Sequence, residues 1–286
     1  MERSRLLRWG SLKRILEVFV CITETPQWFR LTLAYVGLLP LRYPCDMRLR
    51  SGEMLTLRER TDVVIFWMIF VRRHYPVNRS DRVIVDVGAN IGLFTLYAAR
   101  QAPAAHIFSL EPFPDTCQML HRLVKTNRLG HRVTVLNFAI TGSPGMQTMD
   151  AASDIPSQYR RIYSPTTRTM NIKHRGPGGL QQTADGIPVR SETLAHLLDM
   201  EQIETADLIK LNIHGSEYEV LMFSPASALR HVRRIAVQYH ELPAETHLGK
   251  KELFEHLGRS DFRLLSDSDT YRGSGLAVFE ALPRSA

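Results

Sequence analysis

A turn that follows an apolar strand is the part of this sequence with the clearest chemistry. Residues 86–92 read Asp-Val-Gly-Ala-Asn-Ile-Gly, at the end of the β-branched run 83–87 and ahead of an expected helix at 91–100. Gly88 and Gly92 allow the backbone to turn tightly and to approach a ligand, and a helix start offers N–H groups that have no partner inside the helix. The segment is therefore a predicted ligand-binding turn.

The other residues of this turn indicate what kind of ligand it binds. A dinucleotide-binding turn, G-x-G-x-x-G, would have glycine at positions 90 and 93, where this chain has Asn90 and Leu93. Asn90 is among the residue types that tolerate a left-handed backbone. The carboxylate of Asp86 suits a cationic amine better than a pyrophosphate. We therefore expect a zwitterionic, carboxylate-bearing ligand rather than a dinucleotide.

A second acid, Glu111, ends the next apolar run, 106–111, and is followed by Pro112. In a doubly wound sheet this position borders the cleft, where a carboxylate can accept hydrogen bonds from both hydroxyls of a ribose. S-adenosylmethionine has both an amino-acid end and a ribose end, and we expect it as the cofactor. A nicotinamide-dependent oxidoreductase would use the same fold class and stays open as an alternative.

The alternation of apolar runs and helical segments along the chain predicts an α/β fold with a doubly wound, Rossmann-like sheet of seven strands. Near-continuous apolar runs that alternate with helical segments are typical of mostly parallel strands covered on both faces. The last two runs resemble a closing hairpin. The seven expected strands are 83–87, 106–111, 133–139, 208–213, 234–240, 262–265 and 276–279.

We expect two parts along the chain. Residues 1–78 form a helical N-terminal segment, in which the apolar run 61–71 is a buried helix with Asp62 as its cap. Residues 79–286 form the ligand-binding domain. Within it, residues 141–190 are rich in glycine and proline and predict a short β-hairpin with loops near the mouth of the site. A mobile lid over the substrate and plain surface decoration both stay open for this insertion.

Several motifs, in this order along the chain, resemble the signatures of FkbM-type methyltransferases. They are residues 85–92, the pair Glu111-Pro112, the strand around Asn137, the short helix at 193–198, and residues 209–217, Ile-Lys-Leu-Asn-Ile-His-Gly-Ser-Glu. The resemblance covers roughly residues 50–282. It implies O-methylation of a hydroxyl group on a sugar, polyketide or related metabolite. It also implies S-adenosylmethionine as cofactor, with candidate binding residues Asp86, Gly88, Asn90, Gly92, Glu111, Asn137 and Asn212.

The chain departs from this family in the last of these motifs. The usual form, Lys-Ile-Asp-Val-Glu-Gly-x-Glu, is kept at Lys210, Gly215 and Glu217, but Asn212 and His214 replace its first two acids. Losing both carboxylates removes two hard oxygen ligands, so we expect no metal. Imidazole, with an ordinary pKa of about 6.5, can accept a hydroxyl proton near neutral pH. His214 is therefore a candidate base, with a structural role and a loss of activity as the alternatives.

Two further residues are candidates for catalysis. His240 follows the strand 234–240 in the order Gln238-Tyr239-His240, similar to an acid-x-His pattern of the family in which Gln238 takes the place of the acid. Because strand carboxyl ends line the cleft in open α/β sheets, His240 is a candidate for binding substrate or relaying a proton. Lys210, which the chain keeps from the family motif, is the third candidate.

Composition and charge narrow the functional classes. The chain has 286 residues with 36 Lys+Arg against 29 Asp+Glu, a formal net charge of +7, and an ordinary 23% of charged residues. A basic balance of this size is common in Arg-rich enzymes, so we expect no nucleic-acid partner. The three cysteines, Cys21, Cys45 and Cys117, are far apart, which excludes a disulfide scaffold and fits a reducing, cytoplasmic compartment.

The N-terminal residues 1–22 are both basic and apolar. On a helix, Leu12, Ile15, Leu16 and Phe19 would share one face, which fits either packing on the domain or contact with a membrane surface. The next apolar run contains Pro40 and is too short to span a bilayer. A non-catalytic peripheral membrane module is therefore a second alternative function. The sequence does not determine the oligomeric state.

Overall fold

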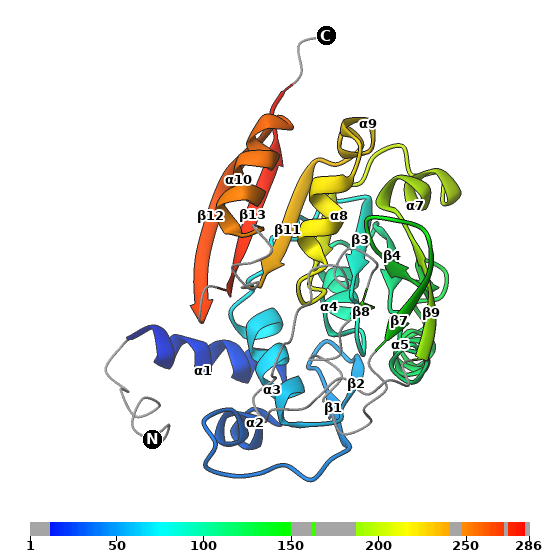
Figure 1. Cartoon of the computed structure of the whole chain (residues 1–286). Coiled ribbons are helices and arrows are strands. Elements are labelled where there is room, and N and C mark those ends of the chain that lie inside the picture. The colour runs from blue at the N-terminus through cyan, green and yellow to red at the C-terminus, as the bar shows by residue number, and fades with distance from the viewer. Residues whose placement is uncertain (1–11, 150–161, 164–186, 241–247, 272–273, 284–286) are drawn as a thin grey trace. The chain divides into compact units, whose positions relative to one another are not determined.

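The computed structural model describes the chain except residues 1–11, 150–161, 164–186, 241–247, 272–273 and 284–286 (Figure 1). It divides into two compact units. The first comprises Met1–Pro76 together with Arg122–His131, and the second comprises Val77–His121 together with Arg132–Ala286. The two units are described separately below.

The first unit contains helices and one short antiparallel hairpin, which the sequence analysis did not predict. Its elements are α1 (Leu12–Glu24), α2 (Trp28–Tyr35), β1 (Cys45–Arg48), β2 (Met54–Leu57), α3 (Arg60–Phe66) and the π-helix η1 (Trp67–Val71). The predicted single helix at 61–71 is thus α3 continued by a π-helical turn. Asp62 is buried, and its carboxylate accepts hydrogen bonds from the backbone N–H groups of Arg58 at 2.6 Å and Glu59 at 3.3 Å. Glu59, rather than Asp62, is the N-cap residue of α3.

The second unit is organised around the predicted seven-stranded sheet (Figure 1). Its strand order is β12-β13-β11-β10-β3-β4-β5, in which neighbours pair in parallel except for β13, which is antiparallel to both β11 and β12. The order reverses beside β3, so the carboxyl ends of β3, β4 and β10 meet at a topological switch point, where open α/β sheets bind ligands. The strands are β3 (Val83–Val87), β4 (His106–Leu110), β5 (Val133–Leu136), β10 (Leu208–Leu211), β11 (Arg234–Tyr239), β12 (Phe262–Tyr271) and β13 (Ser274–Ala281).

Helices between these strands bury the apolar side chains of the sheet. The helix α4 packs on β3 and β4, α8 on β11, and α10 on both β12 and α8. Central strand residues such as Ile84, Val85 and Ile209 are at most 1% exposed, because a parallel strand covered on both faces has no solvent side. The helices of this unit are α4 (Leu93–Gln101), α5 (Pro114–Thr126, which continues into the first unit), α7 (Leu194–Met200), α8 (Glu217–Phe223), α9 (Ala226–Leu229) and α10 (Lys250–Arg259).

The predicted strand at 133–139 is wrong in one respect, because the structure divides it. Its first half is β5 in the large sheet, whereas β6 (Ala139–Ile140) pairs with β9 (Ile187–Glu192) in a separate four-stranded sheet. The strands β7 (Gly145–Met149) and β8 (Ile162–Tyr163) complete that sheet, so the described part of the insertion pairs as β-structure. The two alternatives for 141–190, a lid over the substrate and plain surface decoration, concern mainly residues 150–161 and 164–186, which lie outside the described residues.

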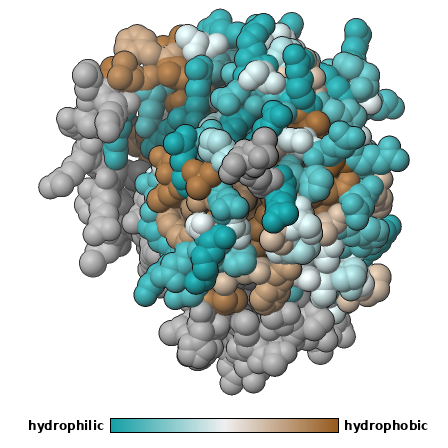
Figure 2. Space-filling view, turned by 90° about the horizontal axis from the view of Figure 1, so that it is seen from above, coloured by the Kyte–Doolittle hydropathy of each residue, from teal (hydrophilic) through white to brown (hydrophobic). Residues whose placement is uncertain are grey.

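No helix in the described part of the chain is long and apolar enough to cross a membrane. In the face that Figure 2 presents, hydrophobic residues lie in several separate groups among hydrophilic ones. Scattered apolar groups of this kind are ordinary on a protein surface.

Candidate functional site

The glycine turn predicted from the sequence joins β3 to α4. Gly88, Asn90 and Gly92 have positive φ angles of 77°, 51° and 91°. The backbone N–H groups of Gly88 and Ala89 both donate to the carbonyl oxygen of Leu110, at 3.0 and 2.8 Å, which ties the turn to the end of β4. The three residues with a left-handed backbone and the two hydrogen bonds to Leu110 therefore fix the conformation of this loop at the switch point of the sheet.

Gly88 is at the tightest point of this loop. A Cβ atom built on it would lie 2.9 Å from Cγ2 of Ile213 and closer still to the carbonyl oxygen of Asn212. Real Cβ atoms are almost never found this close to another heavy atom, so both the backbone angle and the available space require glycine here. The turn consequently lies directly against the residues that leave β10.

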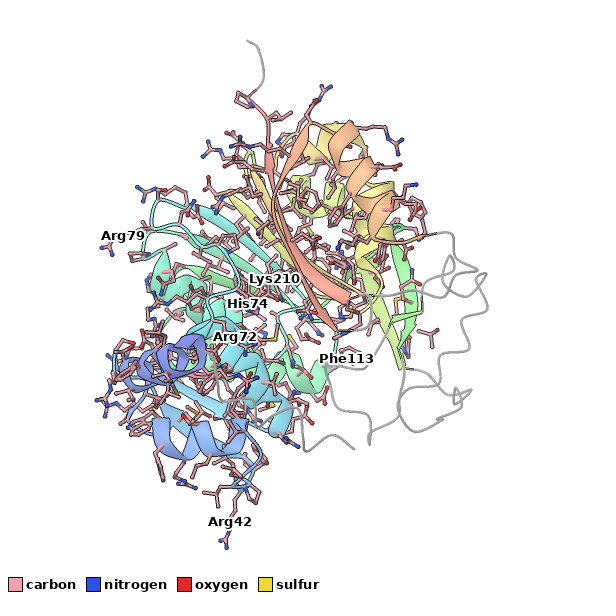
Figure 3. The ribbon with its side chains drawn as sticks, turned by 90° about the vertical axis from the view of Figure 1, so that its left-hand side faces the viewer. Arg42, Arg72, His74, Arg79, Phe113 and Lys210 are labelled. Carbon is pink, nitrogen blue, oxygen red and sulfur yellow. The ribbon has the colours of Figure 1, made fainter. Side chains whose placement is uncertain are left out.

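Asp86 and Lys210 form a buried ion pair on the neighbouring strands β3 and β10, next to this turn. Nζ of Lys210 lies 2.9 Å from Oδ1 of Asp86, and the side chains are 5% and 0% exposed. The ammonium group also donates to the carbonyl oxygens of Gly88 at 2.7 Å and Val87 at 3.4 Å, so its three protons are used inside the protein. Figure 3 shows Lys210 within the sheet. The ion pair and these two hydrogen bonds hold the start of the turn in place.

The second oxygen of Asp86 is also engaged. Thr95 on α4 donates its hydroxyl proton to Oδ2 of Asp86 at 2.8 Å, and its Oγ1 lies 2.9 Å from Oγ of Ser109 on β4. Asp86 therefore links the turn to β10 through Lys210 and to α4 through Thr95. The sequence analysis expected Asp86 to meet a cationic amine, and the cation that the structure places against it is the ammonium of Lys210.

Glu111 lies at the end of β4 and is 4% exposed. Its Oε2 accepts a hydrogen bond from the backbone N–H of Asn90 at 2.8 Å, and its Oε1 accepts one from the N–H of Phe113 at 3.1 Å. The side-chain amide of Asn137 donates to the carbonyl oxygens of Glu111 at 2.8 Å and Pro112 at 3.1 Å. The predicted residues Asn90, Glu111 and Asn137 are thus brought together in one hydrogen-bonded group.

A buried thiol lies near this group. Burial, with a further contribution from the charge of Glu111, raises the pKa of Cys117 on α5 to about 11. The thiol is therefore protonated at neutral pH. Because the thiolate is the nucleophilic form, Cys117 is not an activated nucleophile.

Asn212 and Gln238 meet at the ends of β10 and β11. The amide Nδ2 of Asn212 donates to Oε1 of Gln238 at 3.0 Å. The other amide atom of Asn212, Oδ1, is buried and has no hydrogen-bond partner among the described residues. A buried acceptor without a partner carries a desolvation penalty, which a ligand that donates a hydrogen bond would remove. The backbone of Asn212, the residue directly after β10, is the part of the chain that approaches Gly88.

The two candidate histidines lie side by side beyond these strand ends. The ring centroids of His214 and His240 are 4.7 Å apart, with the rings tilted by 53°. His214 has a positive φ angle of 54°, so its side chain leaves a strained turn after β10. Nδ1 of His240 pairs with Oε1 of Glu217, which is fully buried. In the part of the chain that is described, no three His, Cys, Asp or Glu side chains are grouped to hold a metal ion.

Four residues of this site were not predicted from the sequence: Thr95, Ser109, Glu217 as a partner of His240, and Gln238 as a partner of Asn212. Glu217 had a signal, because it belongs to the same motif as His214 and the strands that end at 211 and 239 are neighbours in the sheet. Thr95 and Ser109 had no local signal, since hydroxyl residues are common within helices and strands.

Comparison with known proteins decides the family. The family model of the methyltransferase FkbM domain matches residues 86–264, from the acid of the glycine turn into β12. The chain belongs to the FkbM methyltransferase family. The resemblance expected from the motifs is therefore confirmed, and the FkbM domain is a methyltransferase rather than the nicotinamide-dependent oxidoreductase kept as an alternative.

Individual proteins that match this chain are distant from it in sequence. Methyltransferase sdnD of Sordaria araneosa is 27% identical over 192 residues, which cover 62% of this chain and 74% of that protein. The 31-O-demethyl-FK506 methyltransferase FkbM of Streptomyces tacrolimicus is 24% identical over 185 residues, covering 59% and 70%. The crystal structure of methyltransferase FkbM from Methylobacillus flagellatus KT aligns with a TM-score of 0.47 at 12% identity, covering 94% of this chain and 58% of that one.

Proposed function

We propose that this FkbM methyltransferase transfers a methyl group from S-adenosylmethionine to a hydroxyl oxygen of a sugar, polyketide or related small molecule or glycan. The observation that carries the proposal is the Glu111 carboxylate, which the N–H of Asn90 holds at the end of β4 beside the glycine turn. A carboxylate at this place in a doubly wound sheet suits the two hydroxyls of a ribose. The hydroxyl specificity is supported by the name of one relative, the 31-O-demethyl-FK506 methyltransferase.

The residues of the turn fit the two ends of this cofactor. Gly88 has no side chain, so the loop keeps a space that a Cβ atom at this position would occupy. Oδ1 of Asn212, beside that loop, is buried without a hydrogen-bond partner among the described residues, and it would accept a hydrogen bond from the amino group of the methionine end. Glu111 accepts hydrogen bonds from the ribose. In this arrangement Asp86 acts through Lys210 and the turn, because its carboxylate is enclosed by protein.

The protein's part in the reaction is to position the acceptor and to receive a proton. When bound, S-adenosylmethionine supplies a methyl group already activated on a sulfonium centre. Residues of the site would hold the acceptor hydroxyl against that methyl group, so that the two groups meet already oriented instead of by a chance encounter. A histidine of the pair His214 and His240 accepts the hydroxyl proton, for a gain of about 10²–10⁴ in rate.

The decisive experiment measures transfer directly. The purified chain is incubated with S-adenosylmethionine and a panel of sugars, polyketides and amino compounds, and release of S-adenosylhomocysteine is followed. We expect release with at least one hydroxyl compound and a product methylated on oxygen. Absence of S-adenosylmethionine binding by calorimetry, or methylation only of the amino compounds, would contradict the proposal.

We also propose that α1 contacts an anionic membrane surface. Three apolar side chains of α1 are largely exposed: Ile15 at 47%, Leu16 at 54% and Phe19 at 61%. The sequence before them carries Arg3, Arg5 and Arg8. An apolar helix face beside basic residues is typical of helices that lie in a membrane interface. The contact would bring the enzyme to a membrane without changing its reaction.

A further inference from the structure

Glu217 and His240 form an oriented pair at the carboxyl edge of the sheet. Glu217 is the first residue of α8 and is completely buried. Its Oε1 pairs with Nδ1 of His240, and its Oε2 accepts the backbone N–H of Gly215 at 2.7 Å. Both carboxylate oxygens are therefore committed, one to the backbone and one to the imidazole. Burying the carboxylate of Glu217 costs free energy of desolvation. A role in function therefore explains the pair of Glu217 and His240 better than a contribution to stability does.

The contact between Glu217 and Nδ1 of His240 determines which ring nitrogen of His240 carries the proton. An ionised carboxylate only accepts hydrogen bonds, so Nδ1 must be the donor. In the neutral imidazole the other nitrogen, Nε2, is then unprotonated and can accept a proton. Nε2 has no hydrogen bond to any residue that the structure describes. The hydroxyl of Tyr218 donates to the carbonyl oxygen of His240 at 2.8 Å, which fixes the backbone of the same residue.

The ring of His214 also borders His240. The centroids of the two rings are 4.7 Å apart, and the rings are tilted by 53°. Asn212 and Gln238, at the adjacent strand ends, are neutral amides. Of these neighbours, the acid that contacts the His240 ring is Glu217.

We propose that His240 is the proton acceptor of the reaction and that Glu217 is the positioning residue that makes it one. The inference rests on the proposed methyl transfer. As the acceptor oxygen forms its bond to the methyl carbon, the bond from that carbon to sulfur breaks and its electron pair stays on sulfur. The hydroxyl proton moves to Nε2 of His240, and Glu217 stabilises the resulting imidazolium.

The variant Glu217→Gln tests this assignment with little change of shape. The N–H of Gly215 can only donate, so it must face the amide oxygen of the new glutamine. The NH₂ group is then left facing Nδ1 of His240, which has to accept, and the ring changes to the tautomer with the proton on Nε2. That tautomer cannot receive the hydroxyl proton. Glu219→Gln, which removes another buried acid of α8, is the matched control.

The first measurement uses nitrogen NMR of the full chain labelled with ¹⁵N-histidine. The signals of His240 are identified by their loss in His240→Gln. We expect the tautomer protonated on Nδ1 in the native protein and in Glu219→Gln, and the tautomer protonated on Nε2 in Glu217→Gln. A native His240 protonated on Nε2 would overturn the proposal.

The second measurement uses the hydroxyl acceptor identified by product release. Glu217→Gln and His240→Gln should each lower kcat by about 10²–10⁴, with the KM for S-adenosylmethionine within about twofold of the native value. Glu219→Gln should stay within about threefold in kcat. A kcat within threefold of native for His240→Gln, or for Glu217→Gln once its tautomer has changed, would overturn the assignment of His240, and so would a loss confined to His214→Gln.

The two measurements also separate this inference from the proposed function. Failure of the native protein to bind S-adenosylmethionine would overturn the methyl transfer, and with it the role given to His240 Nε2. Binding and transfer that persist with an unchanged tautomer in Glu217→Gln would overturn only the positioning role of Glu217.

Discussion

Lys210 and Asp86 are ion-paired inside the sheet, with 2.9 Å between Nζ and Oδ1 and almost no exposure of either side chain. The pair joins β10 to β3, and the same ammonium holds the carbonyl oxygen of Gly88. One lysine thus connects the central strands of the sheet to the turn proposed to bind the cofactor. Its removal should therefore affect stability as well as binding.

Removing one member of this pair should destabilise the protein strongly. Lys210→Met leaves the Asp86 carboxylate buried without its cation, so we expect the free energy of unfolding to fall by about 3–5 kcal/mol. Denaturation by urea measures the change. The exposed pair of Arg263 and Glu280 is the control, since Arg263→Met should change the free energy by only about 0–1 kcal/mol. If Lys210→Met and Arg263→Met lost the same unfolding free energy, burial could not be the reason that the pair of Asp86 and Lys210 matters more.

The glycine turn should not tolerate a side chain at position 88. Gly88→Ala combines a left-handed backbone with contacts to Asn212 and Ile213, so we expect a loss of at least about 2 kcal/mol in unfolding free energy. Gly258→Ala is the matched control, because Gly258 lies in α10 with nothing within 4 Å of its added Cβ. That variant should gain about 0.5–1 kcal/mol. Thermal denaturation compares the two, and an unchanged midpoint in Gly88→Ala would refute the steric argument.

Glu111 should contribute directly to cofactor affinity. Glu111→Ala removes a charged acceptor from the proposed ribose site, so we expect binding of S-adenosylmethionine to weaken by about 1–3 kcal/mol. Isothermal titration calorimetry measures the dissociation constant. Glu255→Ala, on the exposed side of α10, should bind as the native protein does. An affinity unchanged in Glu111→Ala would remove the main support for the cofactor assignment.

Methyl transfer should not depend on a divalent metal. Two acids of the family motif are replaced by Asn212 and His214, and the amide of Asn212 is already bonded to Gln238. An amide and an imidazole are weaker ligands for Mg²⁺ than carboxylates. Activity on the acceptor found by screening should survive EDTA within about twofold. Inactivation by EDTA that magnesium reverses would show that this expectation is wrong.

The proposed membrane contact of α1 can be tested with vesicles. Phe19→Ser removes the most exposed apolar side chain of the helix, and binding to vesicles that contain phosphatidylserine should weaken several-fold because apolar burial in the interface is lost. Co-sedimentation at two salt concentrations separates this contribution from charge attraction. Met200→Ser, an exposed apolar residue of α7, is the control. Native protein that stays unbound from these vesicles would refute the contact.

Local patterns in the sequence were enough for the sheet and for the residues at its switch point. Each strand is a short apolar run, and the candidate ligand residues Gly88, Glu111 and Asn212 each directly follow a strand. Both features depend on a few consecutive residues, because alternation of strand and helix is encoded locally. The division of 133–139 between two sheets was not predictable, since it depends on which distant strand pairs with Ala139.

The partners of the polar side chains were decided only by the tertiary structure. Lys210 meets Asp86 across 124 residues of sequence, and Glu217 meets His240 across 23. Such contacts depend on which strands become neighbours and on their register, and a shift by one residue would turn each side chain to the other face. The sequence therefore determined which residues are available for chemistry at this edge of the sheet. Strand order and register decided that Asp86 is paired with Lys210 and that His240 is paired with the carboxylate of Glu217.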